Sequence, residues 1–184
     1  MGNEINPEEL IAEIHKGRNF RNMDQQLTRQ LIIRELNLSN NRKEIIKNVK
    51  SKLYQIASAF RNEKIDDQTS SDSFGDLTWQ NQEAVKEKCL SLMKNHASTR
   101  ERLPILDAFY HNIFSNLPPI DSVLDLACGL NPLSIPWMPL ENNYSYEAYD
   151  LFQDMMDLIN GFFHHFQIRG TASQLNLLEN YPPN

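Results

Sequence analysis

The sequence has little cysteine and no long apolar run. Its 184 residues include two cysteines, Cys89 and Cys128, which lie far apart and show neither metal-binding nor redox spacing. We therefore expect no bound metal, and a reducing compartment, the cytoplasm, as the place where the protein acts. No apolar run approaches the length of a membrane span, and the polar start of the chain lacks a signal-peptide core, so no membrane partner is predicted.

The common phosphate-binding motifs are also missing. There is no Gly-Lys-Ser/Thr sequence of the kind that holds a nucleoside triphosphate. There is also no Gly-x-Gly-x-x-Gly: the stretch after the most apolar strand candidate reads Ala-Cys-Gly-Leu-Asn-Pro, with Gly129 as its one glycine. A dinucleotide site needs several glycines so that the pyrophosphate can approach the helix. These absences disfavour a pyrophosphate but permit an adenosine cofactor without one, such as S-adenosylmethionine.

The stretch around Gly129 predicts a strand, a tight turn and a short helix. Residues 123–126 suit a buried parallel strand, and the small residues that follow suit a turn. Asn131 before Pro132 is expected to cap a helix that Pro136 keeps short. Such a turn is a usual place to hold a nucleotide-like ligand, although an ordinary core strand-turn-helix has the same pattern.

Charge is distributed unevenly along the chain. The net charge is −6, yet residues 18–64 contain eleven basic and four acidic residues, an excess of seven positive charges. This asymmetry indicates that the basic segment meets a polyanion, and the alternative is a set of solvated helix faces.

The basic segment predicts three short helices. Apolar residues recur at helical spacing in three stripes between residues 8 and 60. Residues 62–76 are polar, rich in Ser and Asp, and predict a linker or mobile loop. We therefore divide the chain into a helical domain, residues 1–75, and a second domain, residues 76–184.

The second domain is expected to be α/β. A helix is predicted over residues 79–94, and Ser98 with Glu101 has the spacing of a capping box, so another helix should begin at Thr99. That would place Arg100 and Arg102 in the first turn, where the helix dipole disfavours cations unless an anion is held there. From residue 122 onward the expected order is strand, short helix, strand, helix, strand, which is half of a doubly wound sheet.

Asp150 ends the second of these strands, 21 residues after Gly129. A carboxylate about 20 residues beyond the glycine turn can accept hydrogen bonds from the hydroxyls of a ribose. A lone Asp at a strand end is also a common turn former. Together with the glycine turn, Asp150 favours an adenosine-containing cofactor.

Several segments together resemble the aminoglycoside-resistance 16S ribosomal RNA methyltransferases. They are HASTRERL, VLDLACGLNPL with the following Pro-Trp, YEAYD and QLNLLENYPP. The pairing of STRERL with CGLNPL is specific, whereas VLDLACG alone marks only a generic methyltransferase. The resemblance implies a ribosome-docking helical domain and a Rossmann-like methyltransferase domain, S-adenosylmethionine as cofactor, and methylation of a guanine N7 in the decoding site of the small subunit.

The resemblance also implies site residues. Arg102 resembles the arginine near the cofactor carboxylate, and Asp150 resembles the residue that binds the ribose. Asn176 and Leu177 resemble the residues that contact the adenine, although the family more commonly has an acidic residue at the position of Asn176. An amide there can still accept a hydrogen bond from the adenine amino group. The expected cofactor-binding set is Arg102, Ala127, Gly129, Asp150, Asn176 and Leu177, and the expected RNA-binding set is Arg42, Lys43, Lys47 and Lys50.

No catalytic side chain is expected for this reaction. Guanine N7 has a lone pair and no proton, so attack on a methyl group needs alignment rather than a general base. We expect a monomer that acts on 16S rRNA within the small subunit. We also expect the chain to be a fragment or truncated product, because the family has further strands and most of the target-base pocket after the third strand. Without those strands, the strand of residues 123–126 would have an unpaired edge. Two alternatives stay open: a non-catalytic rRNA-binding module and a small-molecule methyltransferase.

Overall fold

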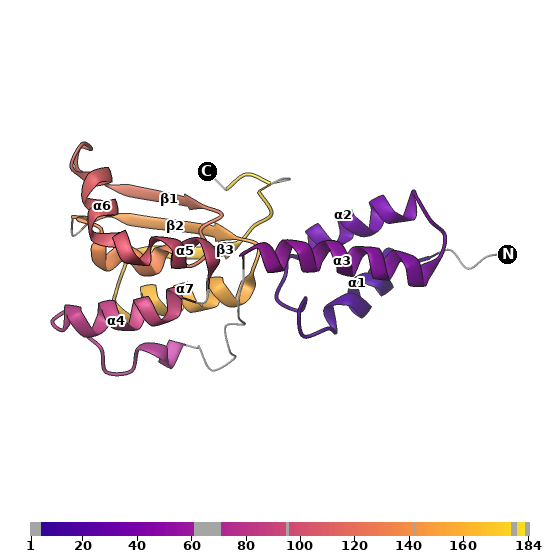
Figure 1. Ribbon diagram of the computed structural model, residues 1–184, viewed down its shortest axis with the longest axis horizontal. Coiled ribbons are helices and arrows are strands. Elements are labelled where there is room, and N and C mark those ends of the chain that lie inside the picture. Colours follow the sequence, from indigo (N-terminus) through magenta and orange to yellow (C-terminus); the bar gives the residue numbers. More distant parts are fainter. Residues whose placement is uncertain (1–4, 61–70, 95, 142, 178–179, 183–184) are drawn as a thin grey trace. The chain divides into compact units, whose positions relative to one another are not determined.

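The computed structural model contains two compact units, Met1–Ala59 and Phe60–Asn184 (Figure 1). It describes residues 5–60, 71–94, 96–141, 143–177 and 180–182. Arg61, Lys64 and most of the expected linker lie outside the described residues. Among the described residues, no helix is both long and apolar enough to cross a membrane.

The first unit consists of three helices, as predicted. These are α1 (Pro7–His15), α2 (Gln25–Leu36) and α3 (Arg42–Phe60). The side chains of Asn6 and Asp24 accept hydrogen bonds from the first turns of α1 and α2 and so cap them. The apolar stripes form the core of the unit, with Leu10, Ile11, Ile14, Leu27, Leu31, Ile32, Ile45, Ile46, Val49 and Leu53 all buried.

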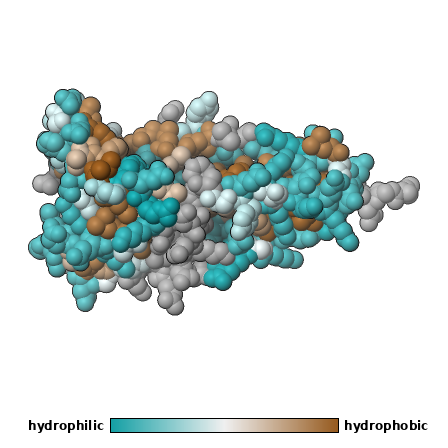
Figure 2. Space-filling view, in the orientation of Figure 1, coloured by the Kyte–Doolittle hydropathy of each residue, from teal (hydrophilic) through white to brown (hydrophobic). Residues whose placement is uncertain are grey.

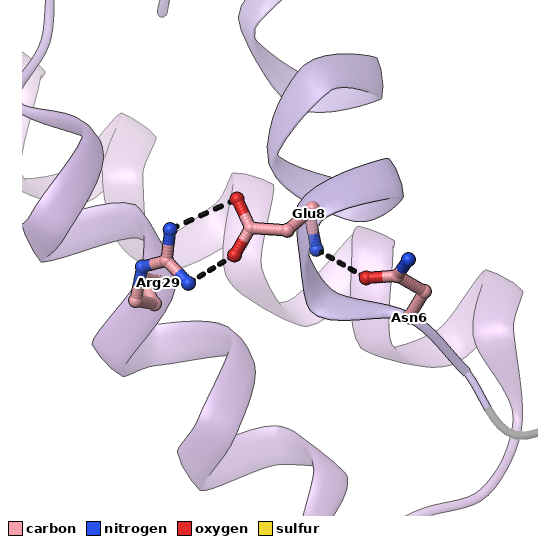
Figure 3. A network of polar contacts seen from close by, with 3 residues as sticks. All are labelled: Asn6, Glu8 and Arg29. Carbon is pink, nitrogen blue, oxygen red and sulfur yellow. Dashed lines mark hydrogen bonds and ion pairs between the residues drawn. The ribbon is translucent and has the colours of Figure 1, made fainter.

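Polar pairs also join the helices of the first unit. Glu8 and Arg29 form a bidentate ion pair between α1 and α2, next to the Asn6 side chain that caps α1 (Figure 3). Glu35 on α2 is only 3% exposed, and its carboxylate accepts hydrogen bonds from Lys52 at 2.6 Å and Asn48 at 2.8 Å on α3. These two contacts satisfy the buried charge of Glu35 and lower its pKa.

The second unit is an α/β structure. Its helical elements are η1 (Ser71–Phe74), α4 (Gln82–Met93), α5 (Ala97–Arg102), η2 (Leu103–Ile105), α6 (Leu106–Phe114), η3 (Asn131–Trp137) and α7 (Gln153–His165). Its strands are β1 (Ser122–Leu126), β2 (Ser145–Asp150) and β3 (Gly170–Gln174), all parallel and in the order β1-β2-β3. The predicted order of strand, short helix, strand, helix, strand is confirmed.

An aromatic cluster fixes η1 on α7. The ring of Phe74 is 1% exposed and lies 5.3 Å from Phe162 and 5.5 Å from Phe166, measured between centroids. The indole N–H of Trp79 donates to the Phe166 carbonyl at 3.0 Å. Residues 71–74, expected to be linker, are therefore a folded part of the second unit, because one aromatic ring anchors an otherwise polar stretch.

Two predictions about the start of α5 were wrong. The helix begins at Ala97, not Thr99, and Ser98 lies inside it, so the expected capping box is not formed. The Thr99 hydroxyl is buried and donates to the carbonyl oxygens of Met93 and His96, at 2.8 and 3.1 Å. Thr99 thereby ties α5 to the end of α4, a contact that local spacing does not reveal.

Strand β1 is also less buried than predicted. It pairs only with β2 among the described residues, and Leu124 and Leu126 are 56% and 47% exposed. Helix α7 packs against β2 and β3, and Figure 1 shows α4, α5 and α7 on one side of the sheet. Figure 2 shows hydrophobic surface on the side of the unit where β1 lies. Among the described residues, β1 has the unpaired edge that the resemblance led us to expect, whereas the burial expected from its apolar composition was wrong.

Candidate functional site

The parallel sheet brings most of the expected cofactor residues to one edge. The carboxyl ends of parallel strands meet at the same edge, and Gly129 follows β1, Asp150 ends β2, and Asn176 follows β3. Backbone hydrogen bonds join these segments: Cys128 N donates to Tyr149 O at 3.0 Å, and Leu175 N donates to Asp150 O at 2.8 Å.

The turn after β1 has an unusual backbone. Ala127 and Gly129 have φ angles of 52° and 54°, in the left-handed region that favours glycine. A Cβ atom placed on Gly129 would come within 2.5 Å of Cε1 in the His96 ring. Gly129 is therefore required both by the backbone conformation and by the close packing of a buried histidine.

The Asp150 carboxylate closes this turn. Its Oδ2 accepts from the Gly129 N–H at 2.9 Å and its Oδ1 from the Leu151 N–H at 2.7 Å. Burial raises the pKa of Asp150, and the hydrogen bonds from backbone amides oppose that shift. Each carboxylate oxygen can accept about two hydrogen bonds, so Asp150 keeps capacity for further donors such as hydroxyls.

A network of hydrogen-bonded polar side chains surrounds the turn after β1. Asp125 Oδ2 accepts from Asn131 Nδ2 at 2.8 Å and from the Tyr146 hydroxyl at 2.7 Å. The Tyr110 hydroxyl, from α6, lies 2.7 Å from Asn131 Oδ1 and 2.5 Å from Ser134 Oγ. The network links α6, β1, β2 and η3 around the turn.

Sequence reasoning missed this network. Asn131 was expected to cap a helix, but the cap position of η3 is Leu130, and the Asn131 amide bridges Asp125 and Tyr110 instead. The available signal was Asp125 itself, a charged residue within an otherwise apolar strand, because a carboxylate in such a place needs hydrogen-bond partners.

Arg102 lies close to the network, though not for the predicted reason. It is in the last turn of α5, where the helix dipole favours a cation, so the argument from a disfavoured first-turn position was wrong. Its guanidinium carbon lies 5.6 Å from the centroid of the Phe109 ring. The positive charge of Arg102 also acts on Tyr110, where it partly offsets the rise in pKa that burial causes.

Asn176 and Leu177 lie two and three residues after the end of β3. Asn176 is 2% exposed and its carbonyl accepts from Asn180 N at 3.0 Å, while Leu177 is half-buried. Cys128 in the turn is buried, and burial raises its pKa, so its thiol is not the activated nucleophile that covalent catalysis requires. No three metal-ligating side chains cluster in the part of the chain that the structure describes.

The expected RNA-binding residues all lie on α3, but they differ in their contacts. Arg42 forms an ion pair with Glu13 at 2.5 Å. Lys43, Lys47 and Lys50 make no ion pair with any described residue, and Lys43 and Lys47 are exposed. The three lysines are therefore the cations of this set that remain available to a partner.

A helical unit followed by a parallel sheet, with a glycine turn after the first strand and a carboxylate at the end of the second, is the arrangement of Rossmann-like nucleotide-binding proteins. Within that class, the chain belongs to the FmrO family of ribosomal RNA methyltransferases, whose family model matches residues 16–184. The resemblance inferred from the motifs is confirmed.

Individual relatives agree with this assignment. A 16S rRNA (guanine(1405)-N(7))-methyltransferase from Micromonospora rosea is 42% identical over 87 residues, which are 47% of this chain and 32% of that protein. The aligned regions span about a third of the length of the curated relatives from three Micromonospora species.

Solved structures establish the same fold. The 16S rRNA methylase RmtB has a TM-score of 0.77 at 23% identity, covering 98% of this chain and 69% of RmtB. The 16S rRNA methyltransferase RmtF, solved in complex with S-adenosyl-L-homocysteine, has a TM-score of 0.73 at 23% identity, covering 100% of this chain and 67% of RmtF.

Proposed function

We propose that this chain supplies the cofactor-binding and RNA-docking parts of an S-adenosylmethionine-dependent methyltransferase. The proposed substrate is a guanine N7 in the decoding site of 16S rRNA within the small ribosomal subunit, and its methylation would confer aminoglycoside resistance. The observation that carries the proposal is the 2.9 Å hydrogen bond from Gly129 N to Asp150 Oδ2. It joins the glycine turn after β1 to the carboxylate at the end of β2, in a chain that belongs to a ribosomal RNA methyltransferase family.

The residues at the sheet edge fit the cofactor. Asp150 would accept hydrogen bonds from the ribose hydroxyls with the acceptor capacity that its backbone hydrogen bonds leave. Ala127 and Gly129 would form the wall beside the cofactor, and a turn with one glycine suits a ligand without a pyrophosphate. Asn176 and Leu177 would contact the adenine, and Arg102 the carboxylate of the methionine part.

Alignment, rather than proton transfer, is the task of these residues. Bound S-adenosylmethionine would supply an electrophilic methyl group. Guanine N7 presents its lone pair without a proton to remove, so the protein has to hold the two reactants in line. The backbone hydrogen bonds and the Asp125 network are suited to this task because they fix the turn before any ligand arrives.

The first unit would dock on ribosomal RNA. Lys43, Lys47 and Lys50 would contact phosphates, and Arg42 would contribute less because it already pairs with Glu13. Phosphate contacts of this kind fix position and make affinity depend on salt. We expect the protein to act in the cytoplasm, as a monomer on the subunit.

Calorimetric titration of S-adenosylmethionine tests the cofactor part of this proposal. The wild-type chain should bind, and Asp150→Ala should abolish binding. Asp107→Ala, at a carboxylate that is 86% exposed, is the matched control and should bind as the wild type does. Methyl transfer to isolated small subunits is then the assay of activity.

Other outcomes would favour the alternatives. A folded chain that binds small subunits but not the cofactor would be a non-catalytic rRNA-binding module. Cofactor binding without any salt-dependent RNA binding would favour a small-molecule methyltransferase.

A further inference from the structure

A line of four side chains, three of them exposed and one, Lys50, partly exposed, runs along α3. Lys43, Lys47, Lys50 and Tyr54 are spaced by four, three and four residues, and residues three or four apart lie above one another on a helix. At 3.6 residues per turn, the four positions fall within about 60° of the helix circumference and span about 16 Å along its axis. They form a single lysine–tyrosine stripe, and Tyr54 is 58% exposed at one end of it.

The stripe is not used inside the first unit. Among the described residues, the Tyr54 ring has no aromatic or cation–π partner and the three lysines have no ion pair. The unit uses other basic side chains for its own stability, namely Arg29 with Glu8, Arg42 with Glu13 and Lys52 with Glu35. The charges and the ring of the stripe are thus available to a partner.

We propose that Tyr54 is a stacking platform for an unpaired nucleobase, placed at the end of a phosphate track formed by the three lysines. This inference rests on the proposed RNA function and narrows it: the RNA segment that α3 meets would be a duplex end or loop with a base that can leave the stack. Aromatic side chains stack on any base face, and single-stranded RNA is commonly held by aromatic rings next to cations.

The surroundings of Tyr54 favour RNA over a protein partner. Its exposed neighbours on α3 are Ser51, Gln55 and Ser58, together with the partly exposed Lys50 and Ala57. A tyrosine that anchors a protein interface normally sits within apolar surface that excludes water. Tyr54 instead lies among small and polar side chains, next to a row of lysines. This arrangement suits RNA, in which phosphates would contact the lysines and a base would contact the ring.

Fluorescence anisotropy with two RNA probes tests the inference on the full chain. One probe is a hairpin of small-subunit sequence with an unpaired purine in its loop, and the other is a fully paired duplex of equal length. Tyr54→Ala should weaken hairpin binding about tenfold and leave duplex binding and the salt slope unchanged. Tyr54→Trp should retain binding, because the larger ring also stacks. Leu38→Ala, at an apolar side chain of the same unit that is 77% exposed, is the matched control and should bind as the wild type does.

Failure of the inference can be told apart from failure of the proposed function. Wild-type affinity of Tyr54→Ala for the hairpin, with binding lost in the Lys43→Glu, Lys47→Glu, Lys50→Glu triple variant, would overturn the stacking role and keep RNA docking. An equal loss of hairpin and duplex binding in Tyr54→Ala would also overturn stacking. Unchanged binding in the triple variant would contradict the proposed docking surface and the stripe with it.

Discussion

The two units use buried polar groups for different purposes. In the helical unit, Glu35 with Lys52 and His15 with Thr28 join neighbouring helices, while Lys43, Lys47 and Lys50 form no ion pair with the described residues. In the α/β unit, polar groups gather at one sheet edge, where Asp125 and Asp150 hold a turn. Polar contacts thus stabilise the first unit and shape a site in the second, so equivalent mutations should have different consequences.

Gly129→Ala should have the largest effect. The substitution combines a left-handed φ of 54° with a Cβ that would lie 2.5 Å from the His96 ring. Strain and overpacking together should lower the free energy of unfolding of the second unit by about 3 kcal/mol and abolish cofactor binding. Urea denaturation and calorimetry measure the two effects.

The matched control for Gly129 is Gly75→Ala. Gly75 has a similar φ of 50°, but a Cβ there would meet no atom within 4 Å. This variant should lose only about 1 kcal/mol and bind cofactor normally. Equal losses for the two variants would mean that packing on His96 has no part in the requirement for glycine.

Lys52→Ala should have the next largest effect, and only on the first unit. It leaves the carboxylate of Glu35, which is 3% exposed, with Asn48 as its remaining hydrogen-bond partner among the described residues. Since Lys52 itself is 44% exposed, solvent screening reduces the loss to about 1–2 kcal/mol. Arg29→Ala, which removes an ion pair exposed on both sides, should cost about 0.5 kcal/mol in the same denaturation experiment. A larger loss of stability in Arg29→Ala than in Lys52→Ala would contradict the view that burial of Glu35 makes its ion pair the more important one.

Tyr110→Phe should affect the cofactor more than the fold. It removes the hydroxyl that contacts Asn131 and Ser134, a change of about 1 kcal/mol. Because both partners shape the turn, cofactor affinity should fall about fivefold. RNA affinity should stay unchanged, and a loss of RNA binding would count against separate roles for the two units.

Sequence patterns predicted the elements of both units well but the site only in part. The stripes of α1, α2 and α3 and the strand ends at Gly129 and Asp150 follow from local periodicity and spacing. The roles of Asn131 and Thr99 depend on side chains from other elements, Tyr110 and the end of α4, which no local pattern specifies. The exposure of Leu124 depends on which strands and helices lie beside β1, not on its composition.

The smallest expected effect is the pH dependence contributed by His15. Burial lowers the pKa of His15, whose Nε2 lies 2.9 Å from Thr28 Oγ1. A lowered folded-state pKa means that the unfolded chain binds the proton more readily. The stabilisation from His15 is therefore present above about pH 6.5, its usual pKa, and is lost as the pH falls through the lower folded-state value. His15→Gln should flatten this part of the urea-midpoint profile between pH 8 and pH 5, and an unchanged profile would assign the pH dependence to other groups.

The central claim is that the helical unit meets RNA while the α/β unit binds the cofactor. The most direct test is the double charge reversal Lys47→Glu with Lys50→Glu, measured for both ligands on the same preparation. We predict weaker binding to small subunits with a reduced salt slope, and unchanged affinity for S-adenosylmethionine. Equal loss of both affinities in a folded protein would contradict the separation of roles.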